Sequence, residues 1–279
     1  MQFWSLSKKS LQNMRKIEKD LSAVPTILNS PNRVEAFLKN IDSSNFTYGK
    51  GLYKTKAVEE KLCEIYHLKC AYCERDISDD DKHIEHYRPK KRYYWLAYSW
   101  DNLLLCCSRC NKAKGDKFLT EHCSVLYGDE AFSQIHNLGR DYDRLEQPKI
   151  INPEREDILD EIVFDRDGKI SSSNPRVTYT IDEVCKLNRN ELVEKRVKLI
   201  NGFIRRVEKH YKRYLDEKNY TNYSMFDPDI EELIDECCVE SEFYAFRYFI
   251  LNNIELFFLE HKILQKILKE KLKLVLKNQ

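Results

Sequence analysis

The chain has 279 residues, of which 42% are hydrophobic and 33% charged, with only 7 glycines and 7 prolines. This composition excludes collagen-like, low-complexity and largely disordered chains, and the length predicts one large or two modest globular domains. The 47 Lys and Arg residues nearly balance 46 Asp and Glu residues, so a nucleic-acid site would have to be a local basic patch.

Two features of the chain indicate a cytoplasmic protein. Residues 1–16 lack the apolar core and cleavage site of a secretory signal, and polar residues interrupt the most apolar stretch, 243–259. We therefore expect a cytoplasmic location and no membrane partner. In that compartment the ten cysteines are expected to be metal ligands or buried thiols rather than disulfides.

The N-terminal part of the chain is predicted to be helical. Amphipathic patterns cover residues 11–21 and 55–68, so we assign a helical segment to residues 1–69. The second of these helices leads directly into residues 70–118, where Cys, His, Asn and aromatic residues are concentrated. This region is therefore the most informative part of the chain for function.

Short strands are predicted in the connection that follows. Residues 150–153 and 162–164 have strand patterns, and residues 169–170 pair with the second of these across an Asp-Arg-Asp-Gly turn. We place these strands in the same module as the Cys and His residues, with bounds 70–180.

The C-terminal part of the chain, residues 181–279, is predicted to be a helical domain. Apolar residues recur at three- and four-residue spacing over residues 191–215, which places them on one face of a long helix. Two further helices are expected at 243–259 and 263–276. The opposite face of the long helix is either a second track for phosphates or the solvent side of an amphipathic helix. Its basic residues are Lys195, Lys198, Arg205, Arg206, Lys209 and Arg213.

Two Cys-x-x-Cys pairs predict a structural zinc site. They are Cys70-Ala-Tyr-Cys73 and Cys107-Ser-Arg-Cys110, with 33 residues between them. Each pair can form a turn that directs both sulfurs at one ion, and four sulfurs complete a tetrahedral Zn²⁺ site with no open position. The alternative is that these are buried free cysteines. The other six, which lack this spacing, are interpreted as ordinary core or semi-exposed residues: Cys63, Cys106, Cys123, Cys185, Cys237 and Cys238.

The residues between the two pairs carry a resemblance to a known family. The run His83-Ile-Glu-His-Tyr-Arg-Pro-Lys90 is followed by Trp100-Asp-Asn102, and Asn111 comes directly after the last cysteine. This set resembles the HNH (ββα-metal) endonucleases. The resemblance implies a mainly α protein with a small α+β core, in which a ββα-metal module is clamped by the zinc site and flanked by helices.

A longer set of motifs narrows the resemblance. The runs C-x-Y-C-E, E-H-Y-R-P-K and W-D-N-L-L-L-x-C-x-x-C-N-x-x-K-G are followed by Ile151-Asn-Pro-Glu154 and Leu187-Asn-Arg189. Together they are similar to the PtuB family, the nuclease subunit of Septu-type antiphage systems, and to retron-associated HNH nucleases. The similarity covers roughly residues 55–200.

The resemblance assigns roles to individual residues. His86, whose ordinary pKa is near 6.5, is the expected general base. Glu85 and Asn111 are expected to hold a catalytic Mg²⁺ or Mn²⁺, since oxygen ligands suit both ions. Asn102 is expected to fix the loop that carries His86. His83 either contacts the ion or orients Glu85, or it is simply a solvated strand residue.

Basic and aromatic residues around these positions are candidates for substrate binding. We expect Arg88, Lys90 and Lys114 to contact phosphates, which position a nucleic acid without reading its sequence. The alternative is that the basic residues form a solvated face. Trp95 and Trp100 are expected to pack over the zinc module. The full cluster comprises Arg88, Lys90, Lys91, Arg92, Lys112, Lys114 and Lys117, with Tyr87, Tyr93 and Tyr94 between them.

These expectations define a metal-dependent endonuclease that hydrolyses phosphodiester bonds, with DNA favoured over RNA. The resemblance adds an ATPase subunit as partner and bacterial antiphage defence as setting. One alternative is a zinc-stabilised adaptor that binds nucleic acid or a partner without cutting. Another is a stand-alone restriction-type nuclease.

Overall fold

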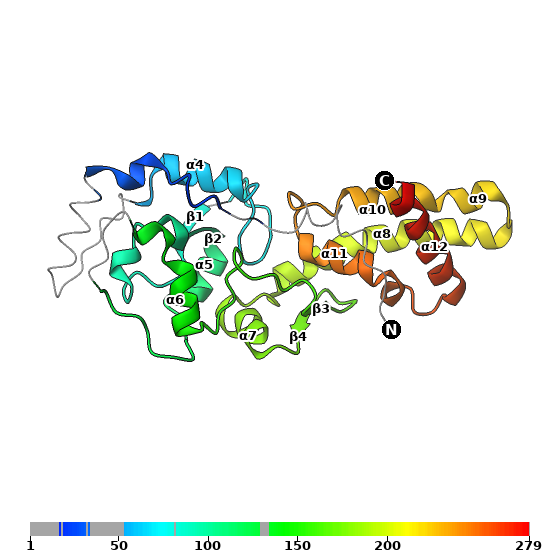
Figure 1. The fold of residues 1–279 in the computed structure, drawn as a ribbon. Helices are drawn as coiled ribbons and strands as arrows, with labels where there is room; N and C mark the ends of the chain where they lie inside the picture. The colour runs from blue at the N-terminus through cyan, green and yellow to red at the C-terminus, as the bar shows by residue number, and fades with distance from the viewer. Residues whose placement is uncertain are drawn as a thin grey trace. The chain divides into compact units, whose positions relative to one another are not determined.

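The computed structural model describes residues 17, 19–31, 33, 53–80, 82–128 and 134–278 (Figure 1). The chain divides into two compact units. We call Lys16–Ile158 with Ser172–Leu187 the motif unit, because it contains the Cys and His motifs. We call Leu159–Ser171 and Asn188–Gln279 the helical unit.

The centre of the motif unit is a two-stranded antiparallel sheet. Strand β1 (Lys82–His86) pairs with β2 (Leu103–Cys107), and His86 lies opposite Leu103 in the register. All five residues of β2 are buried, as its Leu-Leu-Leu-Cys-Cys sequence requires. Helix α5 (Ser108–Lys114) begins directly after β2 and contacts both strands. The order is therefore strand, strand, helix, as the ββα resemblance implies.

Helix α4 (Lys56–Ile65) packs against β2 and delivers the chain to the first Cys pair. It begins where the Thr55 hydroxyl accepts a hydrogen bond from the Val58 amide at 3.4 Å, a typical N-cap. It ends earlier than predicted, because His67 and Leu68 adopt positive φ angles that no helix contains. The predicted helix at 11–21 lies mostly outside the described residues, and residues 19–21 are not helical.

The rest of the motif unit is built from short helical pieces. Helix α6 (Gly139–Glu146) and helix α7 (Pro175–Thr178) follow the sheet in sequence, and a π-helical turn, η5 (Tyr179–Val184), follows α7. Single 3-10 turns lie before β2 and α6: η2 (Tyr94–Leu96), η3 (Trp100–Asn102) and η4 (Ile135–Asn137). A further turn, η1 (Thr26–Asn29), contacts α4. Trp95 and Trp100 are buried, so they are packing residues of the motif unit, while their packing over the zinc module stays a prediction.

The strand predicted at 150–153 is wrong. Ile150 and Ile151 are buried, but Asn152 begins a turn in which its Oδ1 atom accepts the amides of Glu154 and Arg155 at 2.9 and 3.2 Å. An Asn side chain that binds the backbone two residues later competes with strand pairing. The apolar pair therefore fills the core from an irregular segment.

The helical unit begins with the predicted hairpin. Strand β3 (Ile162–Phe164) pairs with β4 (Ile170–Ser172), and Gly168 in the turn has a φ of +74°. The long helix α8 (Asn190–Asp216) then packs against α9 (Tyr220–Ser224) and α10 (Phe226–Asp235). The boundaries predicted at residues 69 and 180 do not coincide with those of the units, because this hairpin groups with the C-terminal helices.

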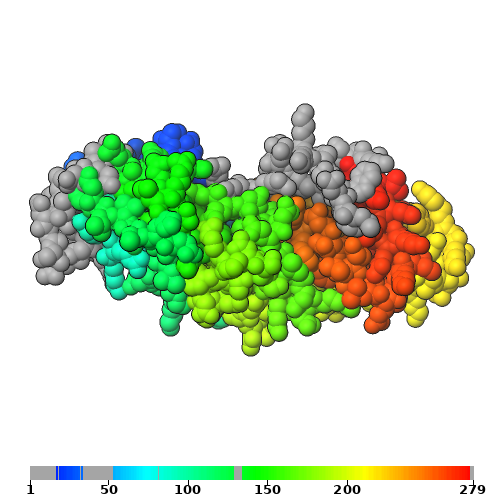
Figure 2. Space-filling model, turned by 60° about the horizontal axis from the view of Figure 1, so that its bottom comes forward, coloured from blue at the N-terminus to red at the C-terminus, as the bar shows by residue number. Residues whose placement is uncertain are grey.

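The last helices form the aromatic part of the helical unit. Helix α11 (Tyr244–Asn252) is shorter than predicted and is followed by the turn η6 (Ile254–Phe257) and by α12 (Lys262–Asn278). These elements, coloured orange to red, lie side by side in Figure 2. Among the described residues, no helix has the length and apolar character needed to cross a membrane.

Four of the six basic residues predicted on the outer face of α8 are engaged within the helical unit, two of them in hydrogen bonds: Arg205 donates to the Asn201 carbonyl at 3.1 Å and Arg213 to the Met225 sulfur at 4.0 Å. The other two form ion pairs. Lys195 pairs with Glu242 at 3.0 Å, and Arg206 pairs with Asp229 of α10 at 3.1 Å. These two cations stabilise the packing of the unit. A phosphate track on the remaining residues stays a prediction.

Candidate active site

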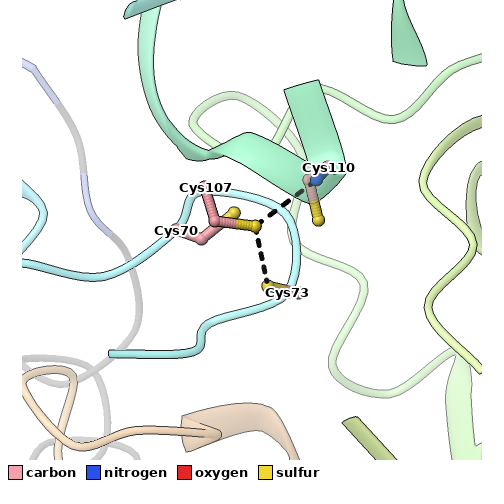
Figure 3. Close-up of side chains that lie close together, drawn as sticks. All are labelled: Cys70, Cys73, Cys107 and Cys110. Carbon is pink, nitrogen blue, oxygen red and sulfur yellow. Dashed lines mark hydrogen bonds between the residues drawn. The ribbon is translucent and has the colours of Figure 1, made fainter. Parts of the chain in front are cut away.

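The four cysteines of the two Cys-x-x-Cys pairs converge (Figure 3). Cys70 and Cys73 lie on the turn after α4, while Cys107 ends β2 and Cys110 lies in the first turn of α5. All four Sγ atoms are buried and lie within 4.8 Å of one another. All ten cysteines, each within the described residues, are free thiols, so this cluster is not a pair of disulfides.

The cluster has the dimensions of a zinc site. Four sulfurs bound tetrahedrally to Zn²⁺ at about 2.3 Å lie about 3.8 Å apart. The Sγ atoms of Cys73 and Cys107 are 3.9 Å apart, and the Cys110 amide also donates to the Cys107 sulfur at 3.4 Å. The chemistry and the spacing of this donor set therefore fit a bound metal ion.

Sequence reasoning missed a fifth cysteine beside the cluster. The Sγ atom of Cys106 lies 3.8 Å from that of Cys70, although Cys106 belongs to no Cys-x-x-Cys pair. The Ala71 amide donates to the Leu105 carbonyl at 2.9 Å, which brings the first pair alongside β2. Cys106 directly precedes Cys107, and this contact brings Cys70 alongside it.

Glu85, a predicted ligand of the catalytic ion, is buried beside a lysine. Its Oε1 atom lies 2.6 Å from the Nζ atom of Lys114, which also donates to the His86 carbonyl at 2.8 Å. Burial raises the pKa of the Glu85 carboxyl, and the Lys114 charge opposes that rise. Lys114 has no exposed side-chain surface, so the structure corrects its predicted phosphate contact: it joins α5 to β1.

His86, the predicted general base, is held in one orientation at the end of β1. Its Nε2 atom lies 3.0 Å from the Ala97 carbonyl oxygen, and its ring packs edge-on against Tyr53 at 4.6 Å between centroids. A carbonyl oxygen only accepts, so Nε2 carries the proton and Nδ1 keeps a free lone pair in the neutral ring. Burial, with a smaller effect of Lys90, lowers the pKa of His86 to about 3.

Asn102 binds the loop that follows His86. Its Oδ1 atom accepts the Arg88 amide at 2.7 Å, and its Nδ2 group donates to the Arg88 carbonyl at 3.0 Å. Its own carbonyl oxygen accepts the Tyr87 amide at 3.0 Å. The two residues after His86 are therefore tied to one asparagine.

Asn111 and His83 lie together on the side of the sheet that α5 covers. The Nδ2 group of Asn111 lies 2.9 Å from Nδ1 of His83, and an amide NH₂ group only donates, so the ring nitrogen accepts. The Oδ1 atom of Asn111 is not used in this contact. His83 and Glu85 share a face of β1, because side chains alternate along a strand.

Arg88 is buried in an ion-pair network instead of facing a substrate. Its Nε atom donates to Glu146 at 2.9 Å and its Nη2 atom to Asp143 at 2.7 Å, with 1% of the side chain exposed. The structure therefore corrects the predicted phosphate contact of Arg88. Lys90 is half-buried, with its Nζ atom 5.3 Å from the centroid of the Tyr53 ring.

The remaining cations of the basic cluster lie at the surface of the motif unit. Lys91 pairs with Asp116 at 2.6 Å, and Arg92 donates to the Phe118 carbonyl at 3.0 Å. Lys112 is exposed on α5 and directly follows Asn111. Lys112 is thus an exposed cation of the cluster that adjoins the candidate site in sequence.

Residues 70–117, which include the four cysteines of the cluster together with Glu85, His86, Asn102 and Asn111, match the HNH endonuclease family. The resemblance inferred from the sequence motifs, and the fold class of a mainly helical protein with a small strand core and a four-cysteine cluster, are both confirmed.

Relatives of the chain are Septu proteins. Septu protein PtuB of Bacillus mycoides (strain KBAB4) is 29% identical over 212 residues, covering 67% of each chain. Septu protein PtuB of Bacillus thuringiensis is 32% identical over 89 residues, or 31% of this chain and 35% of the relative. Septu protein PtuA of Bacillus mycoides (strain KBAB4) is 25% identical over 211 residues, or 70% of this chain and 26% of the relative.

The chain therefore aligns with about two thirds of one PtuB relative and with about a third of the other. The longer alignment with PtuB covers many more residues than the 70–117 match to the HNH endonuclease family. The resemblance to retron-associated nucleases stays a prediction.

Proposed function

We propose that this chain is a metal-dependent endonuclease that hydrolyses the phosphodiester bonds of nucleic acid. The observation that carries the proposal is the fixed orientation of His86, whose Nε2 atom bonds the Ala97 carbonyl and whose loop is bound by Asn102. A histidine held in this way presents one unprotonated nitrogen to a water molecule.

His86 acts as the general base. It is neutral at pH 7, because burial lowers its pKa to about 3, and its Nδ1 atom accepts the proton of the attacking water. A base is most effective when its pKa lies near the working pH. The negative charge of a bound phosphodiester favours the charged imidazolium, so substrate binding raises this pKa toward neutrality.

Glu85 and Asn111 are the residues that would hold the catalytic Mg²⁺ or Mn²⁺. Glu85 uses Oε1 for Lys114, and Asn111 uses Nδ2 for His83, which leaves one oxygen of each side chain for an ion. Both ions prefer oxygen ligands. Such an ion supplies charge neutralisation at the scissile phosphate and at the leaving oxygen. His83 acts by orienting Asn111.

The four-cysteine cluster holds a structural Zn²⁺. Four sulfurs leave no position for water or substrate, so this ion takes no part in the reaction. Its contribution is to fix the end of β2 and the start of α5, which carry Cys107 and Cys110 and, one residue further, Asn111. The zinc site thereby holds a candidate ligand of the catalytic ion in place.

We place the nuclease in bacterial antiphage defence, in the cytoplasm, with an ATPase subunit as partner. The similarity to Septu proteins PtuB and PtuA supports this setting. DNA is proposed ahead of RNA as the substrate, with Lys90 and Lys112 as phosphate contacts.

The proposal is tested with supercoiled plasmid and, separately, structured RNA, each with Mg²⁺, Mn²⁺ or EDTA. Wild-type protein should cut one of the two substrates, and only when Mg²⁺ or Mn²⁺ is present. His86→Ala should cut that substrate about 10²- to 10⁴-fold more slowly. His122→Ala, which changes an exposed histidine, is the matched control and should cut like wild type. Equal rates for wild type and His86→Ala would overturn the assignment of the base.

The same experiment, repeated with an added ATPase partner, separates the nuclease from a zinc-stabilised adaptor. An adaptor binds nucleic acid with no metal-dependent cleavage, both alone and with an added ATPase partner. Cleavage without a partner and with sequence preference would instead favour a stand-alone restriction-type nuclease.

A further inference from the structure

The turn that carries Asn102 is held by a buried lysine from far away in the sequence. The Nζ atom of Lys19 donates to the carbonyl oxygens of Trp100, at 2.6 Å, and of Leu103. It also lies 4.8 Å from the centroid of the Trp100 ring, and the Lys19 side chain is 0% exposed. Lys19 therefore binds the backbone on both sides of Asn102.

The residue before Asn102 is held by an arginine. The carboxylate of Asp101 accepts Arg155 Nη1 and the Gly139 amide, both at 2.5 Å. Only glycine allows this approach, since a Cβ atom at position 139 would lie 2.1 Å from the Arg155 guanidinium and 2.4 Å from the Asp101 carboxylate. The side chain of Asp101 is thus fixed from two directions.

Arg155 also reaches the residue after His86. Its guanidinium carbon lies 5.3 Å from the centroid of the Tyr87 ring, and its Nε atom lies 2.7 Å from Asp143. A planar guanidinium can stack on an aromatic ring while its edge binds carboxylates. Arg155 therefore contacts the neighbours of both His86 and Asn102.

The residue next to Arg155 completes the arrangement. Glu154 Oε1 lies 3.3 Å from the Lys19 ammonium group and accepts the Tyr66 hydroxyl, and Glu154 is 4% exposed. A buried charge is tolerated only when it is paired. Glu154 thus neutralises Lys19, which binds the backbone around Asn102. Arg155 neutralises Asp101, which directly precedes Asn102.

A local turn fixes the backbone of these two residues. Asn152, which is 0% exposed, accepts the amides of Glu154 and Arg155 with one side-chain oxygen. This turn belongs to the segment Ile151-Asn-Pro-Glu154, which the sequence singled out without a role. It lies outside the matched residues 70–117.

We propose that Glu154 and Arg155 are positioning residues for Asn102 and, through it, for His86. Glu154 acts through Lys19, and Arg155 acts through Asp101 and Tyr87. The inference rests on the proposed function only where it says that the position of His86 sets the rate of cleavage. The positioning itself can be measured without a substrate.

Amide hydrogen exchange tests the positioning. The amides of Tyr87 and Arg88 donate to Asn102 at 3.0 and 2.7 Å, so their protection reports where Asn102 lies. In Arg155→Met, both amides should exchange about tenfold faster than in wild type, because local opening costs less. Unchanged exchange in a folded Arg155→Met protein would overturn the proposal.

Arg196→Met is the matched control for loss of a buried arginine. Arg196 is 3% exposed, binds the Gly168 carbonyl at 3.0 Å and stacks on Phe164, but it belongs to the helical unit. It should leave the exchange of the Tyr87 and Arg88 amides unchanged. Faster exchange of these two amides in both variants would assign the effect to general destabilisation and overturn the proposal.

Two milder variants keep the test open where Arg155→Met does not fold. Arg155→Lys keeps the charge but loses the fork geometry, and Glu154→Gln keeps an acceptor for Tyr66 but loses the charge that faces Lys19. Each should increase exchange at Tyr87 and Arg88 in the same direction as Arg155→Met and by less. Wild-type exchange in both, with normal zinc content, would overturn the proposal.

Cleavage kinetics separate this inference from the proposed function. Misplacement of a base lowers kcat, so Arg155→Met should lose about 10- to 100-fold in kcat with little change in KM, and Arg155→Lys should recover part of it. If amide exchange is faster in Arg155→Met but the wild-type protein does not cut, the proposed nuclease function is wrong and the positioning proposal stands. If the wild type cuts and the variants keep wild-type amide exchange and wild-type kcat, the positioning proposal is wrong and the nuclease proposal stands.

Discussion

The ammonium group of Lys114 lies 2.6 Å from the Oε1 atom of Glu85, and both side chains are buried. The same group binds the His86 carbonyl, so one lysine of α5 fixes two consecutive residues of β1. A phosphate cannot reach this lysine without unfolding the helix from the sheet. The pair therefore belongs to the scaffold on which the candidate site is built.

Loss of Lys114 should destabilise the motif unit strongly. Lys114→Met leaves the Glu85 carboxylate buried without its partner, and removal of one member of a buried ion pair costs about 3–5 kcal/mol. The free energy of unfolding in urea measures this loss. Lys112→Met, two residues earlier on the exposed side of α5, should stay within about 0.5 kcal/mol of wild type. Equal stability of the two variants would contradict this account of Lys114.

Loss of one zinc ligand should release the metal and disorder the ββα region. Cys110→Ser removes a thiolate from the first turn of α5, and the binding free energy of such four-thiolate sites, about 10–16 kcal/mol in peptides, is folding free energy. Zinc content by elemental mass spectrometry should fall from about one ion per chain toward zero. Cys123→Ser, at an exposed cysteine outside the cluster, should keep the ion. Full zinc content in Cys110→Ser would exclude the four-cysteine site.

Acid should destabilise the motif unit through His136. This buried ring accepts the Trp100 amide at Nδ1 and contacts Asn29 through Nε2, and burial lowers its pKa to about 4. In the unfolded chain the pKa is about 6.5, so the unfolded state binds more protons between these values. Stability is therefore fully present above pH 6.5 and is lost as the pH falls toward 4, by about 3 kcal/mol in total.

The pH effect is measured as a difference between two proteins. Unfolding free energies of wild type and His136→Gln are compared at pH 7 and pH 4.5, since glutamine has no charge to gain. His86, whose pKa is also lowered, contributes the same slope to both proteins and cancels. A variant with the pH dependence of wild type would show that His136 is not the responsible group.

The parts of the site that the sequence predicted are those encoded by local spacing. The two Cys-x-x-Cys pairs were predicted from their spacing, and the order of β1, β2 and α5 was implied by the resemblance to ββα-metal endonucleases. Asn102 could be placed near His86 by resemblance alone. These features need no knowledge of distant residues.

The parts that the sequence did not predict depend on partners far away in the chain. Arg88 and Lys114 had the appearance of phosphate contacts, and only their pairing with Glu146 and Glu85 shows them to be buried. Lys19 is 81 residues from Trp100, so no pattern in a short window reports their contact. Charge and spacing in the sequence alone do not distinguish a buried, ion-paired side chain from an exposed one that can bind a phosphate.

Substrate binding should depend on Lys112 rather than on Arg88. Lys112 is exposed directly after Asn111, so Lys112→Met should raise KM for nucleic acid and leave the free energy of unfolding unchanged. It should also reduce the slope of the logarithm of the binding constant against the logarithm of salt concentration by about one. Arg88→Met should instead lower stability by about 3–5 kcal/mol, because Glu146 loses its buried partner. The salt slope, taken from binding measured at several KCl concentrations, decides between them. A slope reduced by Arg88→Met in a fully folded protein, with Lys112→Met unchanged, would restore Arg88 as the phosphate contact.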